Sequence, residues 1–398
     1  SRQVVIGRDT RGSGTAIFDA LASGFSKNIT VWNLGIVTSP LLSKAVVETK
    51  SEFGLMITAS HNPACDNGVK IFGSHGEKID KEFEAKLESE IDRLRDEDIP
   101  SLKASVKEVQ VKPRYVVSPE IKNHFRKVVI DSANGSALKF AQQAYDFEST
   151  IGLGDHPDGT NINQDCGSEH PEALQAAVHR AGAAFGIAHD GDGDRVLMCD
   201  EGGAIVPGEV LLGLIAIDLQ QQGRLKNSAI VTTAMSNQGL ARSLEKYGIK
   251  VLLSDVGDRN VAAMMQQEGC NLGGESSGHI IFSDAAPTSD GIQTALLFLE
   301  AVAHLNVSLK KCSEIIALLP QKVCSLPVRQ KIPITELPEL NNIIQFEAEQ
   351  LRDQGKVFVR YSGTEPKLRL LVEAPTEQLA AQILTKIRNG VVNCKKIA

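Results

Sequence analysis

Short apolar runs recur along much of the chain, and each ends in a polar segment with turn-forming residues. Runs of this length with such boundaries predict buried strands. Three of them, at 3–6, 127–130 and 228–231, lead through a loop into a helical pattern of apolar positions. The repeated order of strand, loop and helix predicts three similar α/β domains with mixed sheets.

Three later runs, at 53–57, 185–188 and 270–272, are followed by loops that carry hydroxyls, carboxylates and histidines. Ligands in open α/β sheets bind at the carboxyl ends of the strands. The three loops are therefore expected to converge on one central cleft.

The pattern changes after about residue 323. Helices are expected over 340–354 and 377–389, and strands over 356–360 and 368–374. This mixture is typical of a small α+β domain. The expected domains are therefore 1–119, 120–222, 223–322 and 323–398.

The composition narrows the class of partner and the compartment. The chain has 398 residues, 42% of them hydrophobic, which is ordinary for a globular protein of several domains. Its net charge of −7 argues against nucleic acid as a partner. No apolar run approaches the ~20 residues that span a bilayer, and no leader is evident, so no membrane partner and a cytoplasmic location are expected. The seven cysteines lack C-x-x-C spacing, which predicts reduced thiols.

The most distinctive stretch runs from Phe53 to Phe72, FGLMITASHNPACDNGVKIF. Its strand leads Ser60 into a turn built by the letters HNP, so a hydroxyl lies at the end of a strand. A hydrolase serine would have G-x-S-x-G flanks, which Ser60 lacks. A hydroxyl bonded to its own backbone is the structural alternative for such a serine.

Residues 189–195, HDGDGDR, place three carboxylates at alternate positions: Asp190, Asp192 and Asp194. Oxygen ligands suit magnesium and calcium, and glycine lets the backbone turn tightly around a cation. Three carboxylates this close would repel one another without one. The loop therefore predicts a site for a hard divalent cation.

A calcium-binding EF-hand is the alternative for this loop, with Asp190 as the first ligand and Glu201 as the twelfth. Two features argue against it. Arg195 stands at the sixth position, where the EF-hand requires glycine, and both flanks have strand patterns.

Two more loops carry candidate chemistry, the first with a moderately specific signal and the second with a weak one. The string RYSGTEP at 360–366, with Arg369 after it, offers hydroxyls, backbone N–H groups and guanidinium, which a phosphate monoester requires. The string GESSGH at 274–279 offers a carboxylate and a hydroxyl for sugar hydroxyls, and a histidine for proton transfer. A hairpin turn and a structural histidine are the respective alternatives.

The four strings at 53–72, 189–195, 274–279 and 360–366, in their order and spacing along the chain, resemble the signature loops of the α-D-phosphohexomutase family. The resemblance covers nearly the whole chain. It implies three α/β domains and a C-terminal α+β (TBP-like) domain around a central cleft. It also implies that Ser60 carries a phosphoryl group in the active enzyme. Asp190, Asp192 and Asp194 would then bind Mg²⁺ together with a phosphoryl oxygen on Ser60.

The resemblance also implies roles for other residues. Arg8 would steady the phosphoserine, His61 would orient its phosphoryl group, and Lys70 would be the general base. The implied substrate-binding residues are Arg195, Asp258, Arg259, Glu275, Ser277, His279, Arg360, Ser362, Gly363, Thr364 and Arg369.

The implied reaction moves a phosphate between the 6-hydroxyl and the anomeric hydroxyl of a hexose through a 1,6-bisphosphate. The strings DNGVKIF, AMSNQGL, VGDRNV and DGI resemble members that act on glucosamine phosphates, so the implied partners are a hexosamine phosphate and its bisphosphate. Tyr361 instead resembles relatives that act on mannose or glucose phosphates, which are the nearest alternative. A calcium-binding module and a catalytically silent relative are alternatives of other classes. A monomer or a homodimer is expected.

Overall fold

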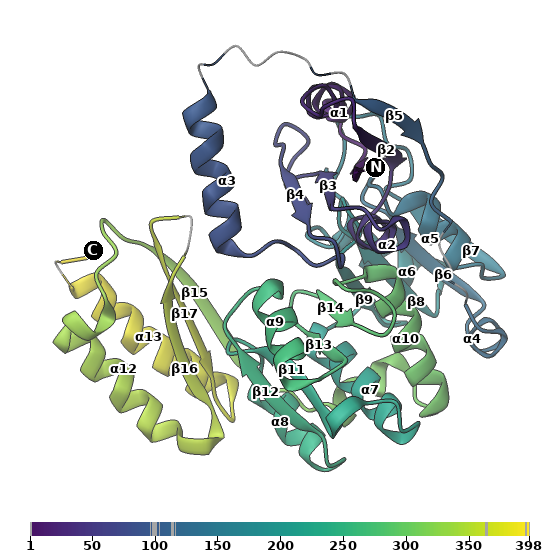
Figure 1. The fold of residues 1–398 in the computed structure, drawn as a ribbon. Coiled ribbons are helices and arrows are strands. Elements are labelled where there is room, and N and C mark those ends of the chain that lie inside the picture. The colour runs from purple at the N-terminus through teal and green to yellow at the C-terminus, as the bar shows by residue number, and fades with distance from the viewer. Residues whose placement is uncertain are drawn as a thin grey trace. The chain divides into compact units, whose positions relative to one another are not determined.

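The computed structural model describes residues 2–95, 97, 102, 104–112, 115, 117–362, 365–394 and 396–397. The chain forms two compact units. Ser1–Thr233 and Ile249–Cys312 make up the first, and Ala234–Gly248 and Ser313–Ala398 make up the second (Figure 1).

The first unit contains three sheets of mixed direction. In the first sheet, β1 (Arg2–Arg8) pairs in parallel with β2 (Ile29–Ile36) and with β3 (Phe53–Ile57). The next strand, β4 (Val69–Phe72), runs antiparallel to β3, and β5 (Ser105–Glu108) extends the other edge in parallel with β2. The strand order is β4-β3-β1-β2-β5.

The second sheet repeats this plan. Its central strand β6 (Lys127–Asp131) lies between the parallel strands β7 (Ser149–Leu153) and β8 (Phe185–His189). The antiparallel strands β9 (Val196–Cys199) and β10 (Ile205–Val206) complete it.

The third sheet repeats the plan again. Here β11 (Ala229–Thr233) pairs in parallel with β12 (Lys250–Ser254) and β13 (Leu272–Gly274), and β14 (Ile280–Phe282) is antiparallel to β13. The prediction of three similar α/β domains with mixed sheets is thereby confirmed.

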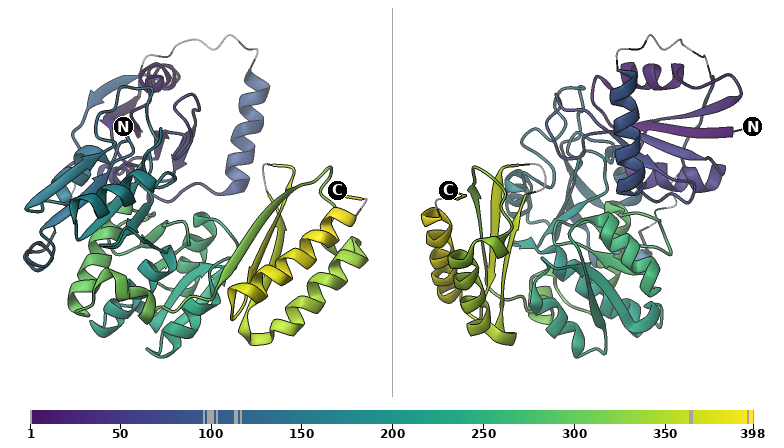
Figure 2. Two further views of the ribbon diagram at one scale, coloured as in Figure 1. Left: turned by 180° about the vertical axis from the view of Figure 1, so that it is seen from behind. Right: turned by 60° about the vertical axis from the view of Figure 1, so that its left-hand side comes forward.

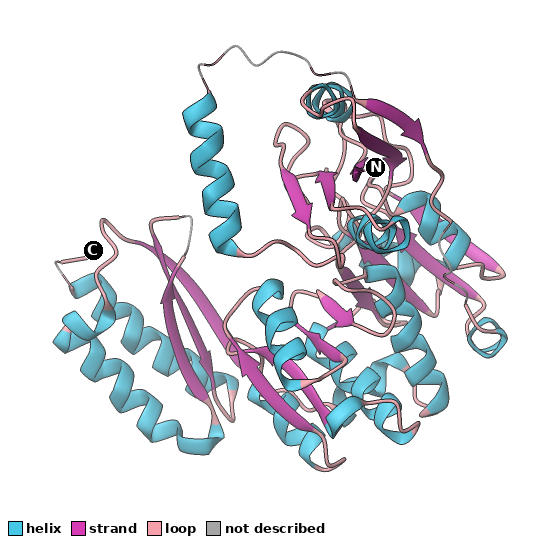
Figure 3. Ribbon diagram, in the orientation of Figure 1, coloured by secondary structure: helices cyan, strands magenta, loops and turns pink. Residues whose placement is uncertain are grey.

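Helices accompany all three sheets, as Figure 3 shows by its colours. They are α1 (Gly14–Ser23), α2 (Ser39–Thr49), α3 (Lys81–Leu94), α4 (Pro119–His124), α5 (Leu138–Ala144), α6 (Glu172–Ala181), α7 (Gly208–Gln221), α9 (Asp258–Glu268) and α10 (Gly291–His304). α7 is buried along nearly its whole length, which is expected of a helix that is apolar on almost every side. It packs against α10, so these two helices form the centre of the unit.

The second unit consists mainly of one small sheet covered by a layer of helices. Its sheet has the order β15-β17-β16, formed by β15 (Gln321–Pro327), β17 (Lys367–Glu373) and β16 (Lys356–Tyr361), all antiparallel. In both views of Figure 2, α12 (Pro338–Leu351) and α13 (Glu377–Asn393) cover the same face of this sheet. Their buried apolar side chains pack on those of β17.

Further short elements belong to the connections: α8 (Gln238–Glu245), α11 (Cys312–Ile315) and four 3-10 turns, at 226–228, 309–311, 334–336 and 352–354. The two strands predicted after residue 323 are present as β16 and β17, but the sequence did not predict β15. Polar Gln321 and Lys322 and the terminal Pro327 obscure the apolar alternation of that strand.

In the described part of the chain, no single helix is long and apolar enough to cross a membrane. Only α10 and Leu309–Ile315, taken together as a pair bent by 90°, meet the requirements of length and composition.

Candidate active site

Three loops of the first unit occupy the same place in their respective sheets. Each joins the third strand of its sheet to the antiparallel fourth strand: 58–68 follows β3, 190–195 follows β8, and 275–279 follows β13. Residues from all three loops contact one another, so the expected convergence of these loops is present in the structure.

Ser60 lies at the centre of this group. Its Oγ donates a hydrogen bond of 2.8 Å to Oδ2 of Asp190, and its backbone N–H donates to Oγ1 of Thr58. The hydroxyl is thus bonded to a different domain rather than to its own turn. The φ angle of Ser60 is +53°, in the left-handed region, which costs a non-glycine residue about 1 kcal/mol.

The side chain of Arg11 fixes the loop 58–68, which carries Ser60. Its guanidinium donates to four backbone carbonyls of that loop, those of Ser60, Asn62, Pro63 and Asp66. The carboxylate of Asp9 accepts from Nε of Arg11 at 3.0 Å and fixes the guanidinium in turn. Because both side chains are buried, this pair forms a rigid support for the turn that carries Ser60.

Arg8 is not part of this group, contrary to the expectation. It is the last residue of β1, and its side chain packs against Gly14 at the start of α1. It lines a separate cavity of about 530 Å³ with Asn33 and Glu108. Side chains alternate between the faces of a strand, which places Arg8 on the α1 side, while Arg11 lies in the loop beyond the strand.

The carboxylates of Asp190, Asp192 and Asp194 form a candidate metal centre. They offer one oxygen each within 4.8 Å of one another, and all three residues are buried. Oδ1 of Asp192 is buried and has no hydrogen-bond partner among the described residues. An oxygen-only donor set with a spare buried oxygen fits a hard divalent cation.

The backbone around these carboxylates depends on glycine. Gly193 has φ +71°, and a Cβ on Gly191 would lie 2.6 Å from the carbonyl oxygen of Ser60. The loop joins β8 to β9, two antiparallel strands, whereas an EF-hand loop joins two helices. The structure therefore gives no support to the EF-hand alternative.

Two lysines balance the negative charge of this cluster. Nζ of Lys70 lies 2.6 Å from Oδ2 of Asp192 and 2.9 Å from Oδ2 of Asp194, and Lys78 lies 3.6 Å from the latter oxygen. Burial by itself would lower the pKa of Lys70, but the aspartates outweigh it and raise that pKa. The neighbouring carboxylates thus favour the charged form of Lys70 in this arrangement.

The carboxylates themselves are under strong mutual repulsion. Burial first, and then the charges of Asp194 and Asp192, raise the pKa of Asp190 to about 7. Burial also acts to raise the pKa of Asp194, but Lys70 and His279 hold it well below its ordinary value. A bound cation would relieve the repulsion at Asp190.

Arg195 links the serine loop to the other two loops. Its guanidinium contacts Nδ1 of His61 at 2.9 Å, Nε2 of His279 at 3.2 Å and Oε1 of Glu169 at 2.6 Å. Burial and the charge of Arg195 lower the pKa of His61, which keeps that imidazole neutral. Glu169 was not predicted, because an isolated glutamate before a helix gives no chemical signal in the sequence.

The loop 275–279 presents its polar groups toward the acidic cluster. Nε2 of His279 lies 3.1 Å from Oδ1 of Asp194, and its Nδ1 lies 3.0 Å from Oγ of Ser277. Glu275 accepts a hydrogen bond from the N–H of Gly257 at 2.9 Å, which ties this loop to the start of α9. Burial lowers the pKa of His279, yet Asp194 outweighs this effect and the pKa is raised.

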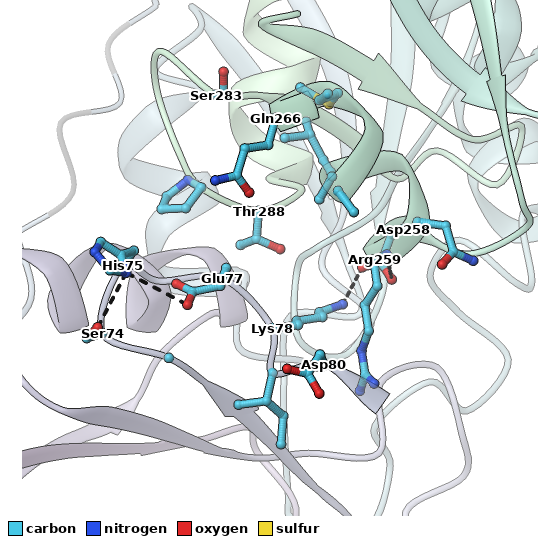
Figure 4. Close-up of a pocket in the computed structure, with 18 of the residues that line it drawn as sticks. Ser74, His75, Glu77, Lys78, Asp80, Asp258, Arg259, Gln266, Ser283 and Thr288 are labelled. Carbon is cyan, nitrogen blue, oxygen red and sulfur yellow. Dashed lines mark hydrogen bonds and ion pairs between the residues drawn. The ribbon is translucent and has the colours of Figure 1, made fainter. Parts of the chain in front are cut away.

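A cavity of about 980 Å³ borders this group (Figure 4). Its wall includes Lys78, whose ammonium pairs with Asp258 at the start of α9, and Arg259, which pairs with Glu84 of α3. Lys78 thus connects Asp258 to Asp194 of the acidic cluster, while Arg259 forms its ion pair with Glu84 on the wall of the cavity. Lys78 also was not predicted.

The predicted phosphate-binding residues belong to the second unit. Arg360 and Arg369 are direct cross-strand partners on β16 and β17, so their side chains leave the same face of the sheet. Two like charges placed opposite each other favour an anion between them. Ser362 follows β16, and its carbonyl accepts from Lys331. Gly363 and Thr364 lie outside the described residues.

The start of α10 supports the acidic loop. The side chain of Asp290 caps this helix by accepting from the N–H of Gln293, and the N–H of Gly291 donates to the carbonyl of Gly193 at 3.1 Å. A Cβ on Gly291 would lie 2.2 Å from the carbonyl oxygen of Arg195. Only glycine allows this approach.

Replacing Gly291 with alanine is therefore expected to lower the free energy of unfolding by about 1–3 kcal/mol, because the backbone must shift. Thermal unfolding measures this as a lower Tm. Gly24→Ala is the matched control, since its new Cβ would meet only the carbonyl of Leu21, at an ordinary 3.5 Å. Equal Tm values for the two variants would contradict the described contact.

Four family models match consecutive parts of the chain. The α/β/α domains I, II and III of phosphoglucomutase/phosphomannomutase match residues 1–98, 104–203 and 207–323. The C-terminal domain of phosphoglucomutase/phosphomannomutase matches residues 324–390.

Curated proteins are similar over nearly the whole chain. Phosphoglucosamine mutase of Streptococcus sanguinis is 37% identical over 402 residues, covering 98% of this chain and 89% of that protein. Phosphoglucosamine mutase of Streptococcus gordonii is 38% identical over 389 residues, covering 94% of this chain and 86% of that protein.

Solved structures share the fold. A phosphoglucomutase/phosphomannomutase family protein of Burkholderia thailandensis has a TM-score of 0.79 and 25% identity, covering 99% of this chain and 90% of that one. The N-acetylphosphoglucosamine mutase of Aspergillus fumigatus, in complex with GlcNAc-6P and magnesium, has a TM-score of 0.66 and 18% identity, covering 89% and 92%. At that identity the second match supports the fold alone.

Proposed function

Because the chain belongs to the phosphoglucomutase/phosphomannomutase family of phosphohexomutases, and is thus a mutase, we propose that it interconverts glucosamine 6-phosphate and glucosamine 1-phosphate. The reaction passes through a phosphoserine enzyme and a 1,6-bisphosphate, on the route to UDP-N-acetylglucosamine. One observation carries the proposal: the hydroxyl of Ser60 lies 2.8 Å from a carboxylate of the only three-aspartate cluster in the described residues.

The choice of an amino sugar rests on the relatives. Those named phosphoglucosamine mutase are 37–39% identical over 94–98% of this chain. The four strings DNGVKIF, AMSNQGL, VGDRNV and DGI support the same choice, since they resemble the versions found in members that act on glucosamine phosphates. Tyr361 keeps the mannose and glucose phosphates as the nearest alternative.

In the proposed reaction, phosphorylated Ser60 is the donor. A sugar hydroxyl forms a new P–O bond while the bond to Oγ of Ser60 breaks, and the proton lost by the sugar balances the one that Oγ regains. Asp190, Asp192 and Asp194 would hold a magnesium ion, which supplies positive charge against the charge that develops on the transferred group. The guanidinium of Arg195 contacts His61 and His279 and so positions both imidazoles near the transferred phosphoryl group.

A single donor serine sets a geometric requirement. The bisphosphate must turn around so that each of its phosphates meets Ser60 once. The loop of Glu275, Ser277 and His279 would bind sugar hydroxyls in either orientation. Arg360, Ser362 and Arg369, with Gly363 and Thr364, would bind the phosphate that is not reacting.

The experiment compares kcat/KM for glucosamine, glucose and mannose 6-phosphates with Mg²⁺ present. Glucosamine 6-phosphate is expected to be preferred by at least about tenfold, which corresponds to about 1.4 kcal/mol in the transition state. A higher kcat/KM for mannose or glucose 6-phosphate would overturn the substrate assignment and leave the family unchanged.

The domain limits, the cellular location and the oligomeric state remain predictions. We propose the domain limits 1–119, 120–222, 223–322 and 323–398; the four matched segments support four domains, and the third of them begins at residue 207. A cytoplasmic location stays a prediction, as does a monomeric or homodimeric state.

A further inference from the structure

We propose that Asn163 is a positioning residue that holds Ser60 in its reactive backbone conformation; this inference rests on the proposed role of Ser60 as phosphoryl donor. The side-chain amide of Asn163 donates to the carbonyl of Ser60 at 2.8 Å and to the carbonyl of Asn62 at 2.9 Å. Both N–H groups of the amide are therefore used on the serine turn.

Asn163 reaches this turn from the other side of the domain boundary. It lies between β7 and α6, and its backbone N–H donates to the carbonyl of Ala133 at 2.9 Å. The same segment contacts the first loop of the chain, where the N–H of Gly12 donates to the carbonyl of Gly159 at 2.8 Å. The segment that carries Asn163 is thus fixed at both ends before its side chain meets the serine turn.

The local backbone of Asn163 suits this task. Its φ angle is +58°, a left-handed conformation that asparagine adopts more readily than most residues, and its side chain is buried. A Cβ on Gly191 would lie 3.0 Å from Nδ2 of Asn163 and 2.6 Å from the carbonyl of Ser60. The acidic loop, the amide and the serine turn therefore pack with no room for a larger residue at position 191.

The consequence for Ser60 follows from its own left-handed φ of +53°. A return to the right-handed region would rotate the peptide planes around Ser60 and move its Oγ away from Asp190. Arg11 contacts the carbonyl of Ser60 only at 3.3 Å, so the shorter bond from Asn163 is the main restraint on that peptide. Arg11 and Asn163 both donate to the carbonyls of Ser60 and Asn62.

The test compares Asn163→Gly and Asn163→Asp with the unaltered enzyme. Glycine keeps the left-handed backbone and removes the amide, while aspartate keeps the shape and removes both donors. We expect kcat to fall between about tenfold and 10²-fold in both variants, because a small misplacement of a reacting group has effects of this size. KM and Tm of Asn163→Gly should stay within about twofold and a few degrees of the unaltered values.

Asn227 offers a matched control elsewhere in the first unit. It also has a left-handed backbone, with φ +57°, and its amide also donates to two carbonyls, those of Glu268 and Gly269. Asn227→Gly is expected to leave kcat unchanged. If Asn163→Gly retains more than half of the original kcat, or loses it only in proportion to a lower Tm, the positioning role is overturned.

A second readout separates this inference from the proposed function. Ser60 is phosphorylated with glucosamine 1,6-bisphosphate, and intact mass follows the gain of one phosphoryl group over time. Slower phosphorylation of Asn163→Gly at saturating bisphosphate supports the inference. An unaltered enzyme that never gains a phosphoryl group contradicts the proposed function itself, whereas equal rates for variant and unaltered enzyme contradict only the role of Asn163.

Discussion

Replacing Ser60 with alanine is expected to abolish turnover, with a fall in kcat of at least about 10⁴-fold. The side chain lost is the one whose oxygen lies 2.8 Å from Asp190 and carries the phosphoryl group in the proposed reaction. The hydroxyl of Thr58 in the same loop is engaged elsewhere, because its Oγ1 accepts the N–H of Ser60. An enzyme-linked assay of glucosamine 1-phosphate formation measures the loss.

The control for this substitution is Ser23→Ala, which removes a hydroxyl that bonds only to the carbonyl of Ala20 on exposed α1. It should leave kcat unchanged. Alanine at this position would have to adopt the same left-handed backbone as Ser60. The Tm of Ser60→Ala is therefore not expected to rise by more than a few degrees. Near-normal rates in Ser60→Ala would show that another group is the donor.

The second large effect is expected for Asp192→Asn. This change removes one negative charge from the cluster and replaces a buried oxygen, so cation binding weakens and kcat/KM should fall by about 10³-fold. Calorimetric titration with MgCl₂ checks the cause independently of turnover: the variant should bind Mg²⁺ at least about tenfold more weakly.

Asp200→Asn is the matched control for the metal-site variant. Asp200 is also buried, but its carboxylate accepts from the N–H groups of Gly202 and Ala204 in the turn after β9. Its replacement should reduce Tm without changing Mg²⁺ affinity. Equal Mg²⁺ affinity for Asp192→Asn and the unaltered protein would contradict the assignment of the cation to this cluster.

The parts of the fold that the sequence predicted well are those where chemistry and periodicity coincide. The strand at 53–57 has the predicted limits, because its apolar run is bounded directly by turn-forming residues. The strand expected at 270–272 lies at 272–274 instead, since its glycines give no apolar signal. The strand β15 was missed for the related reason that its polar positions hide the alternation.

Some residues of the candidate site could likewise be predicted from the sequence, and others could not. Ser60 and the three aspartates stand in strings whose residue types already specify the chemistry, and the structure brings them together. Arg8 lies away from this group, and this was not predicted because a sequence does not show on which face of a strand a side chain lies.

Asn163, Glu169 and Lys78 were missed for a different reason. Glu169 acts through Arg195, 26 residues later in the same domain, whereas Asn163 and Lys78 act through partners in another domain, Ser60 and Asp258. Such pairings depend on how the chain folds and its domains pack, and a local pattern carries no information about that. Supporting residues of this kind are visible only in the folded protein.

The most direct measurement follows a labelled phosphoryl group during a single turnover. Enzyme carrying the label on Ser60 is mixed with unlabelled glucosamine 6-phosphate and Mg²⁺, quenched at short times, and separated into protein and sugar. The label should leave the protein and appear in glucosamine 1,6-bisphosphate before any glucosamine 1-phosphate is formed. Formation of glucosamine 1-phosphate while the label stays on the protein would contradict the account.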